Sequence, residues 1–235
     1  EGFEEFDHMV LGRYPSKAGR QLIARSWVKA AQKRYKEWAK EYGEKPPAGV
    51  KPKIGLDIGI DSDPTVLCQR YENWVAPFAF WKVSDPDESA DKARSVIGDE
   101  DYERVFVDIT GAGHGYPNLL RHRGLGKISG IKVAEKPTAK VTTLGGDVIG
   151  EFTDTRDQLM WMVREWLRDC PDAMLPEDSL LEAELITPTY SPDGKKIKVQ
   201  KKSEVRIRLG GRSTDRFDAL MLTFGESANV LIGMV

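Results

Sequence analysis

Two periods of hydrophobic residues run along the chain, one typical of helices and one typical of strands. In residues 20–42 the apolar side chains recur every three or four positions, which is the spacing of one helix face. They are Ile23, Trp27, Ala31, Tyr35 and Trp38. A second amphipathic helix is predicted over 155–169 by the same spacing. We expect both helices to pack one side against a core.

Short extended segments occupy much of the chain between these two helices. Runs at 53–60, 65–74 and 78–83 are separated by brief connections, which is the pattern of an antiparallel meander. Further along, the elements alternate: a helix around 88–98, a strand at 104–110, a helix near 117–123 and a strand at 128–135. A hairpin that turns at "SPDG" is predicted within 183–200. A last helix begins near "STDRFDALMLTF", capped by Ser213 or Thr214. This order predicts an α/β fold with a mixed sheet.

Composition narrows the class of protein and its domain organisation. Of the 235 residues, 40% are hydrophobic and 31% charged, which fits a globular chain with one sizeable domain. No apolar run approaches the roughly 20 residues of a membrane-spanning helix. Cys68 and Cys170 are too few for a disulfide framework or a zinc site. The segment "GEKPPAGVKPK" at 43–53 is typical of a linker. We therefore expect a helical or linker segment over 1–50 and a folded domain over 51–235.

An aspartate interrupts the first predicted strand. Alternation separates two faces of this strand. One face comprises Ile54, Leu56, Ile58 and Ile60, and the other comprises Gly55, Asp57 and Gly59. A buried carboxylate costs several kcal/mol unless its charge is compensated. We expect the two glycines to leave room beside the carboxylate for a ligand that supplies this compensation.

Further aspartates occur where other elements end or begin. Asp108 lies at the end of the strand at 104–110, just before the Gly-rich turn "GAGHGYP", and ligands in open α/β sheets commonly bind at such strand ends. Asp215 and Asp218 are three residues apart and share one side of the first turn of the last helix.

Such clustered carboxylates are tolerated when a divalent cation neutralises them, and hard oxygen ligands favour Mg²⁺ or Mn²⁺. Two such ions about 3.5–4 Å apart suit phosphodiester cleavage. At this point a set of unrelated capping and turn aspartates is an open alternative.

Four segments are similar, in order and roughly in spacing, to the C-terminal nuclease domain of the large terminase subunit of tailed bacteriophages. They are "IGLDIGIDSDPTVL", "VFVDITGAGHGYPNLLRHRG", "TRDQLMWMVREWL" and "EVRIRLGGRSTDRFDALMLTF". The most specific part is "RSTDRFDALML", which resembles the family's run of a small residue, an Asp, an Arg and then Asp-Ala-Leu. Upstream, "VLGRYPSKAGRQLIARSWVKAAQKR" looks like the linker to the family's packaging ATPase domain. Together the matches cover nearly the whole chain.

The resemblance implies an RNase H-like fold, in which a mixed central sheet with an antiparallel meander is flanked by helices and carries a terminase-type β-hairpin. It also implies an endonuclease that uses two Mg²⁺ or Mn²⁺ ions to cut concatemeric viral DNA during genome packaging. The enzyme would act on double-stranded DNA in the cytoplasm of the infected bacterium. Its partners would be the ATPase domain, the small terminase subunit and the portal.

The resemblance also assigns roles to individual acidic residues. By position, Asp57, Asp108 and Asp218 match the metal-binding, catalytic triad of the family. Asp215 falls where some relatives carry another acidic residue or a His, and it is an auxiliary ligand in this interpretation. Asp63 corresponds to an Asp often found after the first strand, and a turn-forming role is an equal alternative.

Basic residues gather in and after the predicted hairpin. They are Lys195, Lys196, Lys198, Lys201, Lys202, Arg206 and Arg208. Strand alternation would line several of them on one face, which suits contacts to the DNA backbone better than a plain polar edge. His114 follows Asp108 by six residues in the Gly-rich turn, and it either reaches the metal site or a phosphate or lies exposed in a loop.

One departure from the full-length family limits the expected activity. No G-x-x-x-x-G-K-[ST] phosphate loop occurs in the chain, so we expect no ATPase motor in it. Two other functions stay open at this stage. One is a junction resolvase or transposase-like nuclease of the same fold, and the other is a non-catalytic module that binds a portal or a small terminase subunit.

Overall fold

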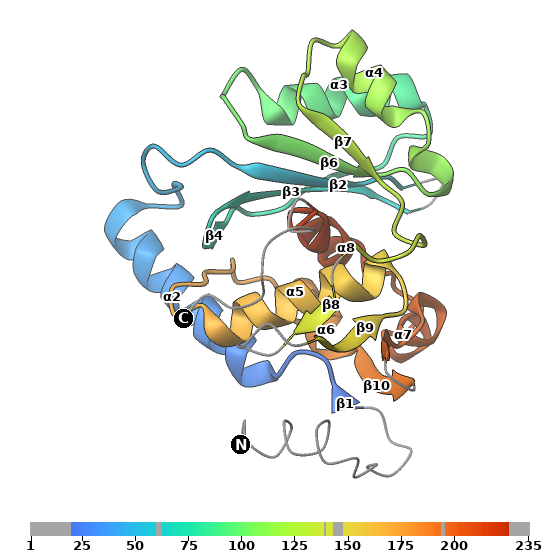
Figure 1. Ribbon diagram of the computed structural model, residues 1–235. Coiled ribbons are helices and arrows are strands. Elements are labelled where there is room, and N and C mark those ends of the chain that lie inside the picture. The colour runs from blue at the N-terminus through green and yellow to red at the C-terminus, as the bar shows by residue number, and fades with distance from the viewer. Residues whose placement is uncertain (1–19, 60–62, 139, 143–147, 194–195, 226–235) are drawn as a thin grey trace.

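The computed structural model describes residues 20–59, 63–138, 140–142, 148–193 and 196–225 (Figure 1). Its larger sheet has the strand order β4-β3-β2-β6-β7, with β5 also paired to β3. These strands are β2 (Lys53–Asp57), β3 (Thr65–Tyr71), β4 (Trp74–Val75), β5 (Ala79–Trp81), β6 (Arg104–Asp108) and β7 (Ile128–Ile131). Strands β2 to β5 pair antiparallel, as the predicted meander requires, while β6 and β7 join in parallel. The predicted mixed sheet is therefore confirmed.

The register of β2 and β6 brings two of the predicted aspartates to one edge of the sheet. Leu56 of β2 lies opposite Val107 of the parallel strand β6. Asp57 and Asp108 come next, so each is the last residue of its strand. Because the two strands run in the same direction, both carboxylates leave the sheet at the same end.

Helices cover both faces of the larger sheet (Figure 1). On one face lie α3 (Pro86–Ile97), the 3₁₀ turn η1 (Gly111–Gly113) and α4 (Tyr116–His122). The apolar face of β2, through Ile54 and Leu56, belongs to the hydrophobic cluster under these helices. The helix α8 (Asp215–Leu222) crosses the opposite face and packs on β2 and β3.

The glycines beside Asp57 serve close backbone packing, which corrects the expectation that they leave room for a ligand. A Cβ atom added at Gly55 would lie 2.0 Å from the carbonyl oxygen of Ala219 in α8. One added at Gly59 would lie 2.2 Å from the carbonyl oxygen of Asp63. Gly55 therefore lets α8 approach the sheet, and Gly59 lets the chain turn back on itself.

A second, smaller sheet lies on the far side of α8 with the strand order β1-β10-β11-β9-β8. Its strands are β1 (Arg20–Gln21), β8 (Lys140–Thr142), β9 (Val148–Phe152), β10 (Thr189–Asp193) and β11 (Lys196–Val199). Strands β10 and β11 form the predicted hairpin, which is shorter than the predicted range. The helices packed with this sheet and around α8 are α5 (Thr155–Asp169), α6 (Ser179–Ile186) and α7 (Lys202–Arg208).

Two segments differ from the predicted hairpin. Residues 183–186 belong to α6, whose start is fixed because the Asp178 side chain accepts hydrogen bonds from the backbone N–H groups of Leu180 and Leu181. Residues 202–208 form α7 instead of extending a strand. The buried side chains Val205 and Leu209 are four residues apart, which is the spacing of one helix face.

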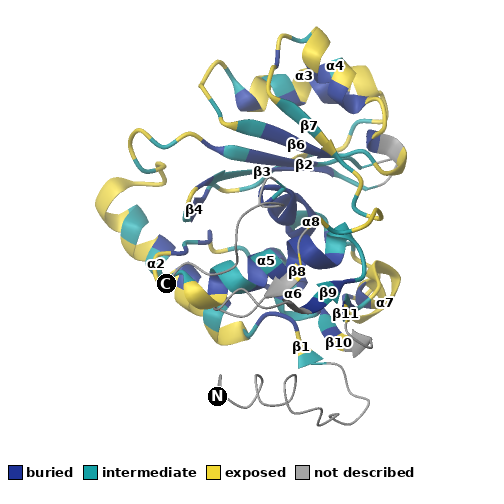
Figure 2. Ribbon diagram, viewed as in Figure 1, coloured by how far each residue is buried: buried dark blue, intermediate teal, exposed yellow. Residues whose placement is uncertain are grey.

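The main core lies between the two sheets, where α5 and α8 are largely buried (Figure 2). The helix α2 (Arg25–Tyr42) contributes the fully buried Val28 and Ala31 to the same cluster. Strand β1 also pairs with β10, so residues 20–42 of the predicted linker segment pack directly on the domain. None of the helices in the described ranges combines the length and the apolar character needed to cross a lipid bilayer.

Candidate metal centre

Three carboxylates from β2 and α8 converge at the end of the larger sheet. Ligand oxygens of Asp57, Asp215 and Asp218 all lie within 4.8 Å of one another. The three-residue spacing puts Asp215 and Asp218 on one side of the first turn of α8. The close approach of α8 at Gly55 then brings this turn to the end of β2. The cluster thus forms where the end of β2 meets the start of α8, and Gly55 allows the two elements to come this close.

Asp218 carries the strongest sign of a missing partner. Its residue is only 4% exposed. Its Oδ2 accepts hydrogen bonds from the Thr214 hydroxyl at 2.8 Å and from the Lys202 ammonium at 2.7 Å. Its Oδ1 is buried and has no hydrogen-bond partner among the described residues. Because a buried unpaired carboxylate oxygen is costly, this atom is available to a cation.

Lys202 is the cation nearest to the cluster in the described structure. Its Nζ also lies 3.9 Å from Oδ1 of Asp215. Partial burial lowers the pKa of Lys202, but the carboxylates of Asp218 and Asp57 outweigh that effect, so its pKa is raised overall. The ammonium therefore stays charged and offsets one of the three negative charges.

The remaining charges are only partly balanced. The pKa of Asp57 is raised well above its ordinary value by burial and then by the nearby carboxylates of Asp218, Asp215 and Asp108. Burial likewise raises the pKa values of Asp215 and Asp108. These shifts mean that the site disfavours its own negative charge. A group of carboxylate oxygens whose negative charge is only partly offset fits a hard divalent cation such as Mg²⁺ or Mn²⁺.

Asp108 lies next to this cluster without being part of it. Its Oδ1 accepts a hydrogen bond from the backbone N–H of Thr110 at 2.8 Å. The group whose oxygens lie within 4.8 Å of one another does not include it. It is nevertheless close enough to raise the pKa of Asp57. The structure thus places Asp108 at the rim of the cluster, at the end of the neighbouring strand.

The start of α8 is held by a residue that the sequence did not indicate. Thr214 occupies the N-cap position, but its hydroxyl bonds Asp218 and makes no capping hydrogen bond. Instead, Oε2 of the buried Glu184 in α6 accepts a hydrogen bond from the backbone N–H of Phe217 at 3.0 Å. A glutamate in an apolar helix carries no sequence signal for this role, because the partner is 33 residues away.

Two further candidates lie outside the group of three carboxylates, although Asp63 is close enough to raise the pKa of Asp215. Asp63 has a half-exposed side chain, and its Oδ1 lies 3.9 Å from Nη2 of Arg206. His114 is exposed at the end of η1. Neither belongs to the group that surrounds Asp218.

The basic residues predicted to contact DNA are spread over a strand, a connection and a helix. Lys195 lies outside the described residues. Lys196 and Lys198 are two apart on β11 and so share a face. Lys201 precedes α7, and Lys202 faces the carboxylates as described above. On α7, Nε of Arg206 donates to the carbonyl oxygen of Gly211 at 2.8 Å, and Nη1 of Arg208 donates to Oε1 of Gln200 at 2.9 Å.

Solved structures with the same arrangement of elements are nucleases of bacterial viruses. No protein-family model matches the chain, and no curated protein matches it either. The nuclease domain of the large terminase subunit gp2 of bacterial virus Sf6 is 24% identical, with a TM-score of 0.67 over 86% of this chain and 97% of that chain. A mutant of that domain with manganese is 22% identical, with a TM-score of 0.65 over the same shares, 86% and 97%.

A second virus provides a more distant match. The large terminase nuclease from thermophilic phage G20c with bound magnesium is 15% identical, with a TM-score of 0.54 over 77% of this chain and 84% of that chain. At sequence identities this low, the similarity establishes the fold alone, and the activity has to be inferred from the site. The chain therefore has the RNase H-like fold of the nuclease domain of phage large terminase subunits.

Proposed function

We propose that this chain is a metal-dependent DNA endonuclease that cleaves concatemeric viral DNA during genome packaging. The observation that carries the proposal is the convergence of three carboxylates around the buried, unpartnered Oδ1 of Asp218. The fold supports it, because the similar structures are terminase nucleases, some of them with manganese or magnesium. The substrate is double-stranded DNA.

In this proposal the aspartates hold two divalent ions. Asp57 and Asp218 are the central ligands, since their oxygens face each other across the β2–α8 contact. Asp108 completes the triad from the neighbouring strand, and the hydrogen bond from Thr110 orients its carboxylate. Asp215 is an auxiliary ligand. Bound ions would lower the pKa of a water and offset charge on the phosphate and the leaving oxygen.

Lys202 offsets part of the negative charge of the same site when no ion is bound. Its ammonium lies 2.7 Å from Asp218, so an ion that binds Asp218 competes with it for the carboxylate. The long, partly exposed side chain lets the ammonium turn away from the site toward a neighbouring phosphate. Lys202 would thus exchange a carboxylate for a DNA contact as the active complex forms.

The packaging role implies partners that the chain would meet as part of a larger assembly. These are an ATPase domain, the small terminase subunit and the portal, in the cytoplasm of the infected bacterium. They belong to the proposal because the similar structures are terminase nuclease domains.

Metal-dependent nicking of a supercoiled plasmid tests the proposed activity. We expect nicking with Mn²⁺ or Mg²⁺ and none with a chelator. Asp57→Ala, Asp108→Ala and Asp218→Ala should each abolish nicking and leave the fold intact. Asp172→Ala, at an exposed position in the turn after α5, is the matched control and should cut like the wild type. Full activity in one of the three variants would remove that residue from the mechanism.

Metal binding is measured separately from cleavage. A ligand at 100 times its Kd stabilises the native state by about 2.7 kcal/mol. For a chain of this length, each kcal/mol raises Tm by about 2–4 °C, so Mn²⁺ should raise Tm by about 5–10 °C. Asp218→Asn should show no such shift. If the wild type shows neither a Tm shift nor nicking, the hypothesis of a non-catalytic binding module is favoured. Faster cutting of branched DNA than of linear DNA would instead favour a junction resolvase.

A further inference from the structure

A cavity opens directly beside the metal centre. It encloses about 410 Å³ between the β2–β3 connection and β5 on one side and α6, α7 and the start of α8 on the other. Asp215 lines this cavity and also belongs to the carboxylate cluster, so the two sites are continuous. The volume lies within the range of about 300–1,000 Å³ that is usual for ligand pockets.

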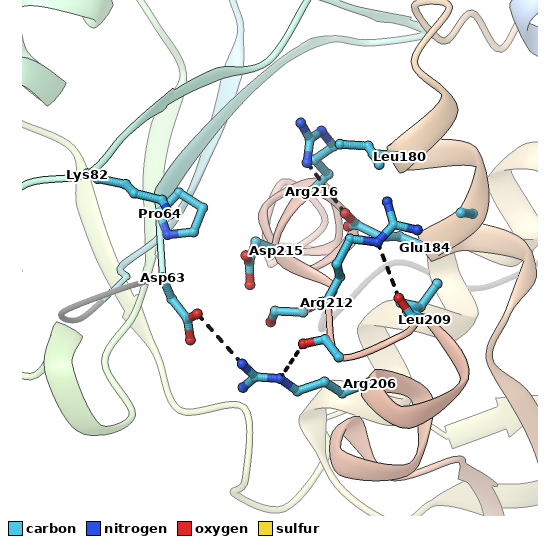
Figure 3. Close-up of a pocket in the computed structure, with 13 residues that line it drawn as sticks. Asp63, Pro64, Lys82, Leu180, Glu184, Arg206, Leu209, Arg212, Asp215 and Arg216 are labelled. Atoms are coloured by element: carbon cyan, nitrogen blue, oxygen red, sulfur yellow. Dashed lines mark hydrogen bonds and ion pairs between the residues drawn. The ribbon is translucent and has the colours of Figure 1, made fainter.

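Four cationic side chains line the cavity, together with the carboxylates of Asp63, Glu184 and Asp215 (Figure 3). The cations are Lys82, Arg206, Arg212 and Arg216. Two of them are engaged by carboxylates. Nε of Arg216 lies 2.8 Å from Oδ2 of Asp178, and Nη2 of Arg206 lies 3.9 Å from Oδ1 of Asp63. The charge of Arg216 is therefore offset at close range, whereas the half-exposed pair of Arg206 and Asp63 offsets only part of the charge of Arg206.

The other two cations, Lys82 and Arg212, have no described carboxylate within ion-pair distance. Nε of Arg212 donates to the carbonyl oxygen of Leu209 at 3.2 Å, which fixes the side chain and leaves the two Nη groups for another acceptor. Lys82 follows β5 and is exposed. Figure 3 shows Lys82 beside Pro64 on one side of the cavity and Arg212 on the other. An anion in the cavity would have a cation on each side.

We propose that this cavity binds the DNA phosphate next to the one held at the metal centre, with Lys82 and Arg212 as its ligands. The inference rests on the proposed function, since it takes DNA as the ligand. A polymer with a phosphate at the metal centre necessarily places another phosphate one nucleotide away. Arginine Nη groups and a lysine ammonium suit a phosphate, and such backbone contacts set the position of a duplex without reading its sequence.

The proposal gives Lys82 and Arg212 a measurable effect on the salt dependence of DNA binding. Each phosphate contact releases counterions, so removing one should lower the slope of log K against log salt by about 1. The lost charge-assisted hydrogen bonds correspond to a loss of affinity of about tenfold or more for each side chain. The probe is a short fluorescein-labelled DNA duplex, followed by anisotropy over about 50–200 mM salt in Ca²⁺.

The wild type, Lys82→Ala, Arg212→Ala and the double variant are compared with a control variant. Lys92→Ala is the matched control, because Lys92 is an exposed lysine on α3, on the opposite face of the larger sheet. Both changed positions are exposed, so all variants should unfold at the wild-type temperature. We expect the slope to fall by about 1 in each single variant and by about 2 in the double variant, with no change in the control.

The outcomes separate this proposal from the proposed function. Wild-type affinity and slope in the double variant would overturn the phosphate site, whatever the nicking assay shows. An equal loss in Lys92→Ala would also overturn it, because the effect would then come from the general surface charge. Absence of nicking in the wild type would refute the nuclease, whereas the binding measurement would still decide whether the cavity holds a phosphate.

Discussion

Replacing Glu184 by Gln should make the stability of the metal-free protein less dependent on pH. Glu184 is buried. Its Oε2 accepts a hydrogen bond from the backbone N–H of Phe217, and its Oε1 lies 3.6 Å from Nη1 of Arg216. Burial raises the pKa of Glu184 from 4.5 to about 8, although both of these contacts favour the ionised form. A glutamine keeps an oxygen acceptor for Phe217 but has no proton to bind or release.

The magnitude follows from the difference between the folded and the unfolded pKa. In the wild type, the folded state holds a proton up to about pH 8, while the unfolded state loses it near pH 4.5. The native state therefore binds more protons between these values, and stability falls as pH rises through the window. The slope is at most about 1.4 kcal/mol per pH unit, and the total is on the order of 5 kcal/mol as an upper limit.

Urea unfolding in a chelating buffer from about pH 5 to pH 8 measures this effect. As pH rises, the free energy of unfolding of Glu184→Gln should increase by several kcal/mol relative to that of the wild type. Only the wild type loses the contribution of a protonated Glu184. Glu37→Gln changes a glutamate whose side chain is 60% exposed on α2, and it should follow the wild type in parallel. Parallel curves for Glu184→Gln and the wild type would refute the assignment of a buried, protonated Glu184.

Two further substitutions test the packing and the charge of the metal centre. Gly55→Ala puts a Cβ 2.0 Å from the Ala219 carbonyl oxygen, so α8 must shift. We expect the free energy of unfolding, measured with urea, to fall by about 1–3 kcal/mol and Mn²⁺ to bind more weakly. Wild-type values for both would show that the contact is not tight. Lys202→Met removes the ammonium that competes with the ion for Asp218. Calorimetric titration should therefore show Mn²⁺ binding up to about fivefold tighter, which corresponds to about 1 kcal/mol for a partly exposed ion pair. Weaker binding would mean that Lys202 supports the ion instead of competing with it.

The parts of the fold with strong hydrophobic periods were predictable from the sequence. The meander of β2 to β5 and the helix α5 occur where the alternation and the helical spacing predict them. The positions of Asp215 and Asp218 on one side of a helix turn also followed from spacing alone. In these cases the local pattern and the tertiary environment demand the same structure.

Other features depend on contacts between distant segments and leave no local trace. Residues 202–208 are charged at most positions, so Val205 alone marks a buried face, and α7 was not predicted. The role of Gly55 depends on Ala219, which lies on another element. The sequence predicted that Lys202 contacts the DNA backbone, and only the fold shows that its ammonium reaches Asp218. Such pairs are set by the tertiary fold, which a single sequence does not encode locally.

The electrostatic cost of the metal centre and the close packing of α8 have a common origin. Gly55 brings α8 against β2, and this same contact brings Asp218 to Asp57. Repulsion between these carboxylates acts to push the helix away, but the fully buried side chains of Phe217 and Leu220 hold it in the core. Together with the ammonium of Lys202, this burial opposes the repulsion between the carboxylates. The unbalanced charge that remains is available to bind the ions.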